Sequence, residues 1–136
     1  MGLLARADAA AVNKLCADIT LPDHTLLRAP EIGGVMVRGR AGATGGPFNL
    51  GEMTVTRCSA KLACGTIGHA YVQGRDKTHA TQAALIDALM QTDAADQIAA
   101  KVLDPLREAE QIARASRAAK AAATKVDFFT MVRGED

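Results

Sequence analysis

Residues Tyr71–Gln91 read YVQGRDKTHATQAALIDALMQ, and this stretch decides the fold. It begins with the alternation typical of a strand and passes through a glycine turn that carries Arg75, Asp76 and Lys77. Alanine and leucine residues then recur at helical spacing, and Asp76 stands where a helix N-cap belongs. The stretch therefore predicts a strand, a charged turn and a helix that begins at Asp76.

The sequence before this stretch predicts more β-structure. His24–Ala29 and Val35–Arg40 each alternate in the manner of short strands, and we expect them to form an antiparallel pair. Met53–Ala63 and Thr66–Val72 predict the clearest hairpin of the chain, with Cys64-Gly65 as its tight turn. These runs indicate an antiparallel sheet.

A glycine-rich segment, AGATGGPFNLGE at residues 41–52, predicts a loop between these strands. A phosphate-binding loop is the alternative interpretation. The segment lacks a closing Gly-Lys-Ser/Thr, contains no GxGxxG and is followed by no predicted helix. We therefore expect a long connection and no nucleotide site of the usual kind.

The two ends of the chain predict helices and a last strand. Leu3–Ala17 has helical periodicity, as does Ala94–Leu103, and Asp104-Pro105 predicts a capped restart of a third helix that runs to Ala123. Val126–Val132 is apolar on both faces, as in a strand buried between neighbours. The predicted fold is α+β, one domain over residues 1–136, with an antiparallel sheet of about four strands, an N-terminal helix, a C-terminal helical segment and a terminal strand.

Composition limits the function further. Of the 136 residues 49% are hydrophobic but only 3% are aromatic, and much of the apolar content is alanine, which buries little surface. Such a core indicates a protein that partners complete. The net charge of +1 gives no drive toward nucleic acid or a membrane. Three cysteines with no zinc spacing, no secretory segment and no 18-residue apolar run predict a cytoplasmic protein.

The turn Gln73–Lys77 has two interpretations. Backbone N–H groups at the start of a helix attract anions, Arg75 can hold phosphate or phosphonate oxygens bidentately, and Lys77 adds a point charge. Asp76 opposes this, because its carboxylate would occupy the helix end and repel an anion. A structural cap with a salt-bridging arginine is the favoured interpretation, and direct anion contact is the alternative.

Other residues carry weaker predictions. Arg57 lies in a strand and either projects into solvent or pairs at an interface. Phe128 and Phe129 either pack on the chain's own core or enter a partner sheet by strand addition. The three histidines are isolated and predict no metal site, and no nucleophile and base form a convincing catalytic set.

Four separate segments, in the same order, resemble the PhnG family, the G subunit of the carbon–phosphorus lyase core complex. They are PFNLGEMTVTRC (Pro47–Cys58), GHAYVQGRDKTHA (Gly68–Ala80), ALIDALMQ (Ala84–Gln91) and VDFFTMVRG (Val126–Gly134). The resemblance runs from Leu3 to the end of the chain.

The resemblance implies an accessory subunit of a phosphonate-ribosylating transferase complex. In that reaction methylphosphonate displaces adenine from MgATP and gives alpha-D-ribose 1-methylphosphonate 5-triphosphate. It implies the H, I and J subunits as partners, transient contact with the L subunit, and no cofactor bound by this chain, with MgATP a substrate of the complex. No residue is expected to be catalytic in this chain alone. The candidates for substrate or interface contacts are Arg57, Gln73, Arg75, Asp76, Lys77 and, more weakly, Arg133.

Two alternatives remain open from the residues. The chain either contributes a phosphate-contacting residue, Arg75 or Lys77 first, to a composite active site, or acts as an independent small-ligand binding module.

Overall fold

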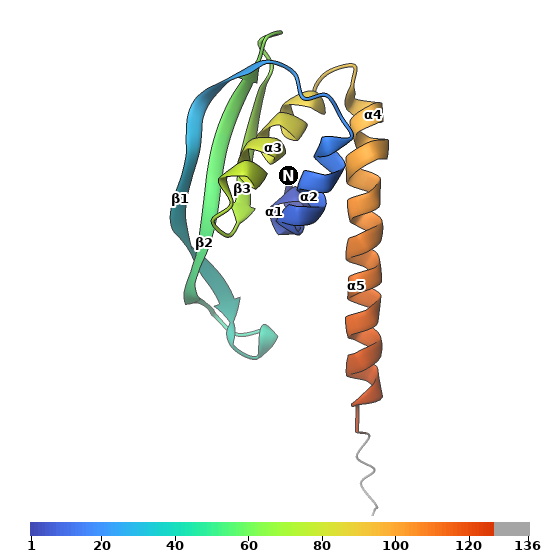
Figure 1. Cartoon of the computed structure of the whole chain (residues 1–136). Helices are drawn as coiled ribbons and strands as arrows, with labels where there is room; N and C mark the ends of the chain where they lie inside the picture. The colour runs from blue at the N-terminus through green and yellow to red at the C-terminus, as the bar shows by residue number, and fades with distance from the viewer. Residues whose placement is uncertain (127–136) are drawn as a thin grey trace, which may run out of the picture.

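The computed structural model describes residues 1–126, and it shows helices packed on one face of a three-stranded antiparallel sheet (Figure 1). The strands are β1 (His24–Arg40), β2 (Pro47–Leu62) and β3 (Ile67–Gln73), in the order β1-β2-β3. The predicted α+β class is confirmed. The described residues contain three strands, whereas about four were predicted, and residues 127–132 of the predicted terminal strand lie outside the described range.

Two predicted short strands are one long strand. We expected His24–Ala29 and Val35–Arg40 to pair with each other, but both belong to β1, which pairs with β2 along its length. Pro30 does not end the strand, because it lies at a register shift on an edge strand, where its missing N–H costs no ladder hydrogen bond. Gly34 leaves room for the side chain of Glu52, which occupies the position that a Cβ would take.

The prediction of a loop over residues 41–52 was correct for the first part of this segment and wrong for the second. A short 3₁₀ turn covers Ala41–Ala43, and β2 already begins at Pro47. The second hairpin is as predicted: Gly65 has φ of +93° in the turn, and its N–H donates to the Leu62 carbonyl at 2.9 Å. β3 then returns along the part of β2 from Val55 to Lys61.

Helix α3 (Lys77–Leu89) confirms the predicted helix and its cap. The His79 N–H donates to Asp76 Oδ1 at 2.9 Å, which satisfies one of the free donors at the helix start. α3 lies across β3 and β2 and contains more buried residues than any other described helix. It is tied to the N-terminal region by the buried His79, whose Nε2 hydrogen-bonds to the Leu4 carbonyl at 2.9 Å.

The N-terminal segment forms two helices, and the prediction of one helix was wrong. They are α1 (Gly2–Arg6) and α2 (Ala9–Ala17). Ala7 is extended between them, and Asp8 accepts a hydrogen bond from the Ala11 N–H at 3.2 Å. Because a short carboxylate competes for backbone donors, Asp8 starts a new helix more favourably than it continues the old one.

The C-terminal helices run on without the predicted restart. α4 (Ala95–Ile98) passes through one π-helical turn, η2 (Ala99–Leu103), into α5 (Asp104–Ala123). Asp104 is helical and does not cap; its carboxylate accepts from Arg107 at 2.6 Å. The wider π turn accommodates Pro105, which has no N–H to donate, so the chain need not break there.

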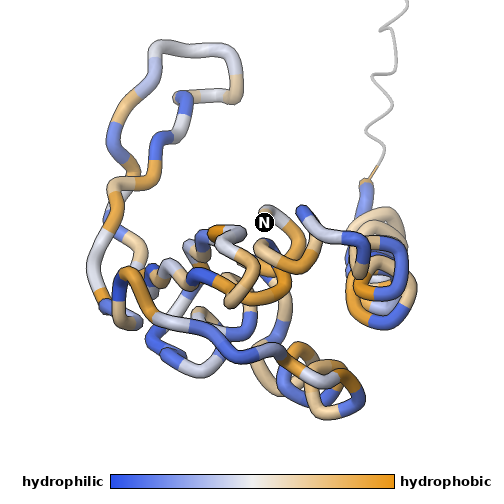
Figure 2. Tube along the Cα trace, turned by 90° about the horizontal axis from the view of Figure 1, so that it is seen from above, coloured by the Kyte–Doolittle hydropathy of each residue, from blue (hydrophilic) through white to orange (hydrophobic). Residues whose placement is uncertain are grey.

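The core lies between the helices and the face of the sheet that they cover. Its largest fully buried side chains are Leu4, Val12, Thr56, Cys58, Val72, Leu85, Ile86 and Val102, with six alanines among the remaining core residues. The hydropathy-coloured trace shows apolar segments converging there (Figure 2). Within residues 1–126, no helix combines the length and apolar character needed to cross a membrane.

Two elements project from this core in the same direction (Figure 1). One is the hairpin arm, residues 34–54 of β1 and β2 with their connection, where β3 no longer pairs with β2. The other is α5, in which Leu106 is the only buried residue. Along much of their length, no other helix or strand of residues 1–126 packs against the hairpin arm or α5.

Candidate functional site

The turn between β3 and α3 holds most of the predicted site residues. Gly74 has φ of +90°, a conformation that favours glycine, and its N–H donates to the Thr54 carbonyl at 3.0 Å. The Thr56 hydroxyl donates to the Gly74 carbonyl at 2.8 Å. Two hydrogen bonds to β2 therefore fix this turn relative to the sheet.

The predicted residues of the turn do not converge on one site. Gln73 lines a groove between the N-terminal helices and α5, and Arg75 lines a hollow at the base of the hairpin arm. Asp76 faces a hollow beside α2, and Lys77 faces one beside β1. The turn thus presents four side chains to four different surfaces, a divergence that sequence spacing does not reveal.

Asp76 is already engaged by the protein. Its carboxylate caps α3, so a negative charge from this chain occupies the helix end. The structure confirms the cap part of the favoured interpretation. The salt-bridging arginine is not found, because Arg75 makes no ion pair with any of residues 1–126. An anion bound to the start of α3 would meet that carboxylate, and repulsion between like charges disfavours such a ligand.

Arg57 lies on the face of the sheet that no described helix covers. Its Nε donates to Glu31 Oε2 at 3.1 Å, and Arg28 is 3.7 Å from the same oxygen. All three side chains are about half exposed, so the pair contributes little to stability, roughly 0–1 kcal/mol. Arg133 lies outside the described residues.

A serine and a histidine also meet on this open face. Ser59 Oγ lies 2.9 Å from His69 Nδ1, a contact that pairs residues opposite each other on β2 and β3. Asp87 does not complete a triad, because its carboxylate accepts from the backbone N–H of His69 and not from the ring. The cross-strand register was needed to find this pair, since ten residues separate the two in sequence.

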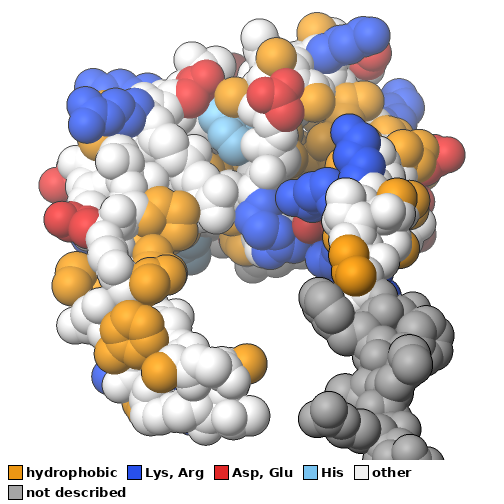
Figure 3. All heavy atoms as spheres, turned by 90° about the horizontal axis from the view of Figure 1, so that it is seen from below, with side chains coloured by type: hydrophobic (Ala, Val, Ile, Leu, Met, Phe, Trp, Pro, Cys, Tyr) orange, Lys and Arg blue, Asp and Glu red, His pale blue; other side chains and the backbone are white. Residues whose placement is uncertain are grey.

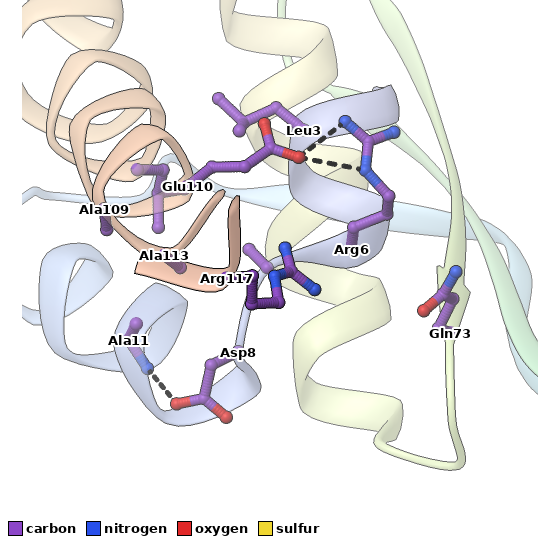
Figure 4. Close-up of a pocket in the computed structure, with 11 residues that line it drawn as sticks. Leu3, Arg6, Asp8, Ala11, Gln73, Ala109, Glu110, Ala113 and Arg117 are labelled. Atoms are coloured by element: carbon purple, nitrogen blue, oxygen red, sulfur yellow. Dashed lines mark hydrogen bonds and ion pairs between the residues drawn. The ribbon is translucent and has the colours of Figure 1, made fainter. Parts of the chain in front are cut away.

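A cavity lies in the groove between α1, α2 and α5 (Figure 4). Its volume is about 420 Å³, and Gln73 lies at its edge. The walls are mostly apolar. They are formed by Leu3, Ala7, Ala11, Leu106, Ala109 and Ala113. The alanines on α5 are too small to reach the N-terminal helices, so the groove stays open.

Four charged side chains border this groove. Arg6 donates from Nε and Nη2 to Glu110 Oε1, at 3.2 and 3.0 Å, and Asp8 caps α2. Arg117 makes no hydrogen bond or ion pair with any of residues 1–126. Figure 4 shows its guanidinium between Asp8 and Gln73. The groove therefore offers one unpaired cation and one amide beside an apolar wall.

Sequence reasoning missed this groove. Arg117 is not among the residues predicted from the sequence, because nothing in the spacing shows that α5 turns it toward Gln73. The helical period does group Ala109, Ala113 and Arg117 on one face, and that signal was available. Within residues 1–126 no three histidine, cysteine, aspartate or glutamate side chains gather as a metal site.

Comparison with known proteins supplies the functional context. The family model described as "Phosphonate metabolism protein PhnG" matches residues 1–134. A protein of Rhizobium meliloti (strain 1021), named alpha-D-ribose 1-methylphosphonate 5-triphosphate synthase subunit PhnG, is 48% identical over 116 residues. The match covers 85% of this chain and 74% of that protein.

Proposed function

This chain belongs to the PhnG family of phosphonate metabolism proteins, and we propose on that premise that it is an accessory subunit of a synthase complex. The complex would form alpha-D-ribose 1-methylphosphonate 5-triphosphate, the product in the relative's name. In the reaction that we propose, a methylphosphonate oxygen attacks the ribose C1′ of MgATP. The bond from C1′ to adenine breaks, and adenine leaves with a proton. Partner subunits would supply that chemistry.

The exposed hairpin arm is the observation that carries this proposal. Met36, Phe48 and Leu50 are 60%, 46% and 66% exposed on it. A two-stranded hairpin is at best marginally stable in water, and clustered exposed apolar side chains mark protein contact sites. The arm is therefore suited to being covered by another subunit. We propose the H, I and J subunits as lasting partners and the L subunit as a transient one.

Substitution of the arm tests this role. We expect the double variant Phe48→Ser and Leu50→Ser to lose co-purification with the other synthase subunits, because it removes the apolar contacts. The isolated variant should keep the far-ultraviolet circular dichroism and urea midpoint of the original chain, since neither side chain belongs to the core. Synthase turnover in the reconstituted mixture should fall with assembly.

Leu27→Ser is the matched control. Leu27 is also an exposed leucine on a strand, but it lies on the body of β1 and not on the arm. It should co-purify normally. An arm variant that assembles and supports turnover as the original chain does would contradict the proposal.

A second function is favoured by the groove in Figure 4. Arg117 and Gln73 line one cavity, so the chain could contribute a phosphate-binding cation to a composite active site. Arg75, which lines a separate hollow at the base of the hairpin arm, is the second candidate. We expect Arg117→Ala or Arg75→Ala to lower turnover without loss of assembly if that contribution exists. Loss of co-purification instead would assign the residue to an interface, and no effect on either would remove it from both roles.

A further inference from the structure

The free half of α5 carries charge of one sign only. From Gln111 to Ala123 this half contains Arg114, Arg117 and Lys120 and no aspartate or glutamate. The side chains of this half are exposed from Gln111 onward. Cations near a helix C-terminus are favoured by the helix dipole, but such a run also leaves a positive surface with no acidic neighbour on the same element.

The face of α5 that lines the groove continues beyond it. Ala109, Ala113 and Arg117 face α1 and α2, and the helical period places Lys120 on the same face one turn further on. α1 and α2 no longer cover the helix at that level, and the hairpin arm projects from the body in the same direction as α5 (Figure 1). Seen from below, the arm shows gathered hydrophobic side chains, and lysine and arginine side chains gather between it and α5 (Figure 3).

The chain exposes more surface than a compact monomer of its mass. It has 9482 Å² of accessible surface, whereas a compact monomer of that mass exposes about 6,800 Å². A partner that covers the arm and α5 would bury part of this surface.

We propose that the arm and the free half of α5 bind one segment of a partner subunit. That segment carries apolar side chains toward the arm and acidic side chains toward α5. This inference rests on the proposed function, because it assumes the synthase assembly. It adds where the partner binds and what its surface carries. Acidic side chains would neutralise Lys120 and also Arg114, which the helical period places at the side of that face. Apolar side chains would cover Phe48 and Leu50.

Charge reversal is the first test. We expect Arg114→Glu with Lys120→Glu to weaken the affinity for the purified partner subunits by about tenfold or more at low salt, because like charges would then face each other. Arg117 stays unchanged, since it lines the groove. Binding of the original chain should weaken as salt rises above about 0.1 M, and the variant should lose that dependence. Circular dichroism checks that the variant helix is intact.

Lys14→Glu with Lys101→Glu is the matched control. It changes the net charge equally, but both residues lie on the body of the molecule. Its affinity should stay within about twofold of the original chain, since surface charges away from a contact contribute little. Equal loss in both variants, or no loss in either, would overturn the inference.

Cross-linking tests whether one segment is gripped. A photoreactive residue at Leu50 and another at Lys120, introduced separately into the assembled complex, should label the same partner segment, and that segment should contain aspartate or glutamate. Labels in different subunits, labels in this chain alone, or labelled nucleic acid at position 120 would each overturn the inference. If the original chain fails to assemble at all, the proposed function fails instead, so the two failures are distinguishable.

Discussion

Gly68 sits on β3 at the point where α3 crosses the sheet. A Cβ at this position would overlap the Ala84 carbonyl oxygen and the Ala88 nitrogen, which are backbone atoms and cannot turn aside. The close contact lets an alanine-rich helix pack directly on a strand. It explains how a core with few large side chains still closes on this side of the sheet.

Gly68→Ala should therefore destabilise the chain. We expect a loss of about 1–3 kcal/mol or more in the free energy of unfolding, because α3 must move off the sheet. Urea denaturation followed by circular dichroism measures the loss. Gly51→Ala is the control, since a Cβ at Gly51 meets no atom within 4 Å. Equal stability of the two variants would contradict this account of the packing.

The three cysteines differ in chemistry because they differ in burial. Burial raises the pKa of the Cys16 and Cys58 thiols. Hydrogen bonds from Thr66 lower the pKa of the exposed Cys64 thiol below its ordinary value of 9.0. Since the thiolate is the reactive form, Cys64 should react first with a thiol reagent.

The pH dependence of that reaction tests the assignment. We expect one rapidly labelled cysteine per folded chain, with a rate that reaches half its maximum below pH 9.0, because a lowered pKa populates the thiolate at lower pH. Thr66→Val removes the side-chain hydrogen bond and should shift the midpoint upward. Labelling of Cys16 or Cys58 at a comparable rate would contradict the burial seen here.

At the scale of elements, helix α5 divides into two halves. Its first half contacts the body through the buried Leu106 and the pair of Arg6 with Glu110, whose atoms approach to 3.0 Å. The second half, Gln111–Ala123, has no buried residue. A helix without a packed face depends on propensity alone, and its alanines supply that only in part.

Hydrogen exchange should separate the two kinds of helix. We expect the amides of Gln111–Ala123 to exchange much faster than those of α3 in the isolated chain, because local opening there disrupts no core. Adding the partner subunits should slow exchange in this half and in the hairpin arm. Protection equal to that of α3 in the isolated chain would contradict the absence of a packed face on this half.

The elements also show how far sequence patterns reach. α3 and its Asp76 cap follow directly from local periodicity and a local hydrogen bond. The break at Asp8, the continuous β1 through Pro30 and the uninterrupted helix at Asp104 do not. At each of these points the chain can either continue or end its helix or strand. Strand pairing or helix packing with distant residues decides between the two.

At the scale of the whole molecule, the chain is a small core with two projecting elements. Such a shape leaves more surface exposed than a compact monomer of the same mass, and binding would cover part of it. A partner that binds only the folded chain stabilises it by mass action. Stability should therefore depend on the assembly.

Thermal unfolding with increasing partner concentration tests this dependence. We expect the Tm of the chain to rise with partner subunits, in line with about 2.7 kcal/mol of added stability at a partner concentration one hundred times the Kd. The arm variant Phe48→Ser with Leu50→Ser should show no such rise, and the Leu27→Ser control should show all of it. A Tm that does not change with partner concentration would contradict the proposed coupling.

The sequence by itself determined the α+β class, the β2–β3 hairpin, the helix after Asp76 and the family, because each depends on short-range patterns. Only the tertiary structure decided which candidate residues meet. Gln73, Arg75, Asp76 and Lys77 are neighbours in sequence, yet the tight turn at Gly74 sends them to separate surfaces. Gln73 and Arg117 line one groove because α5 packs against α1 and α2 at the other end of the chain. The two residues lie far apart in sequence, so no local pattern indicates that they meet.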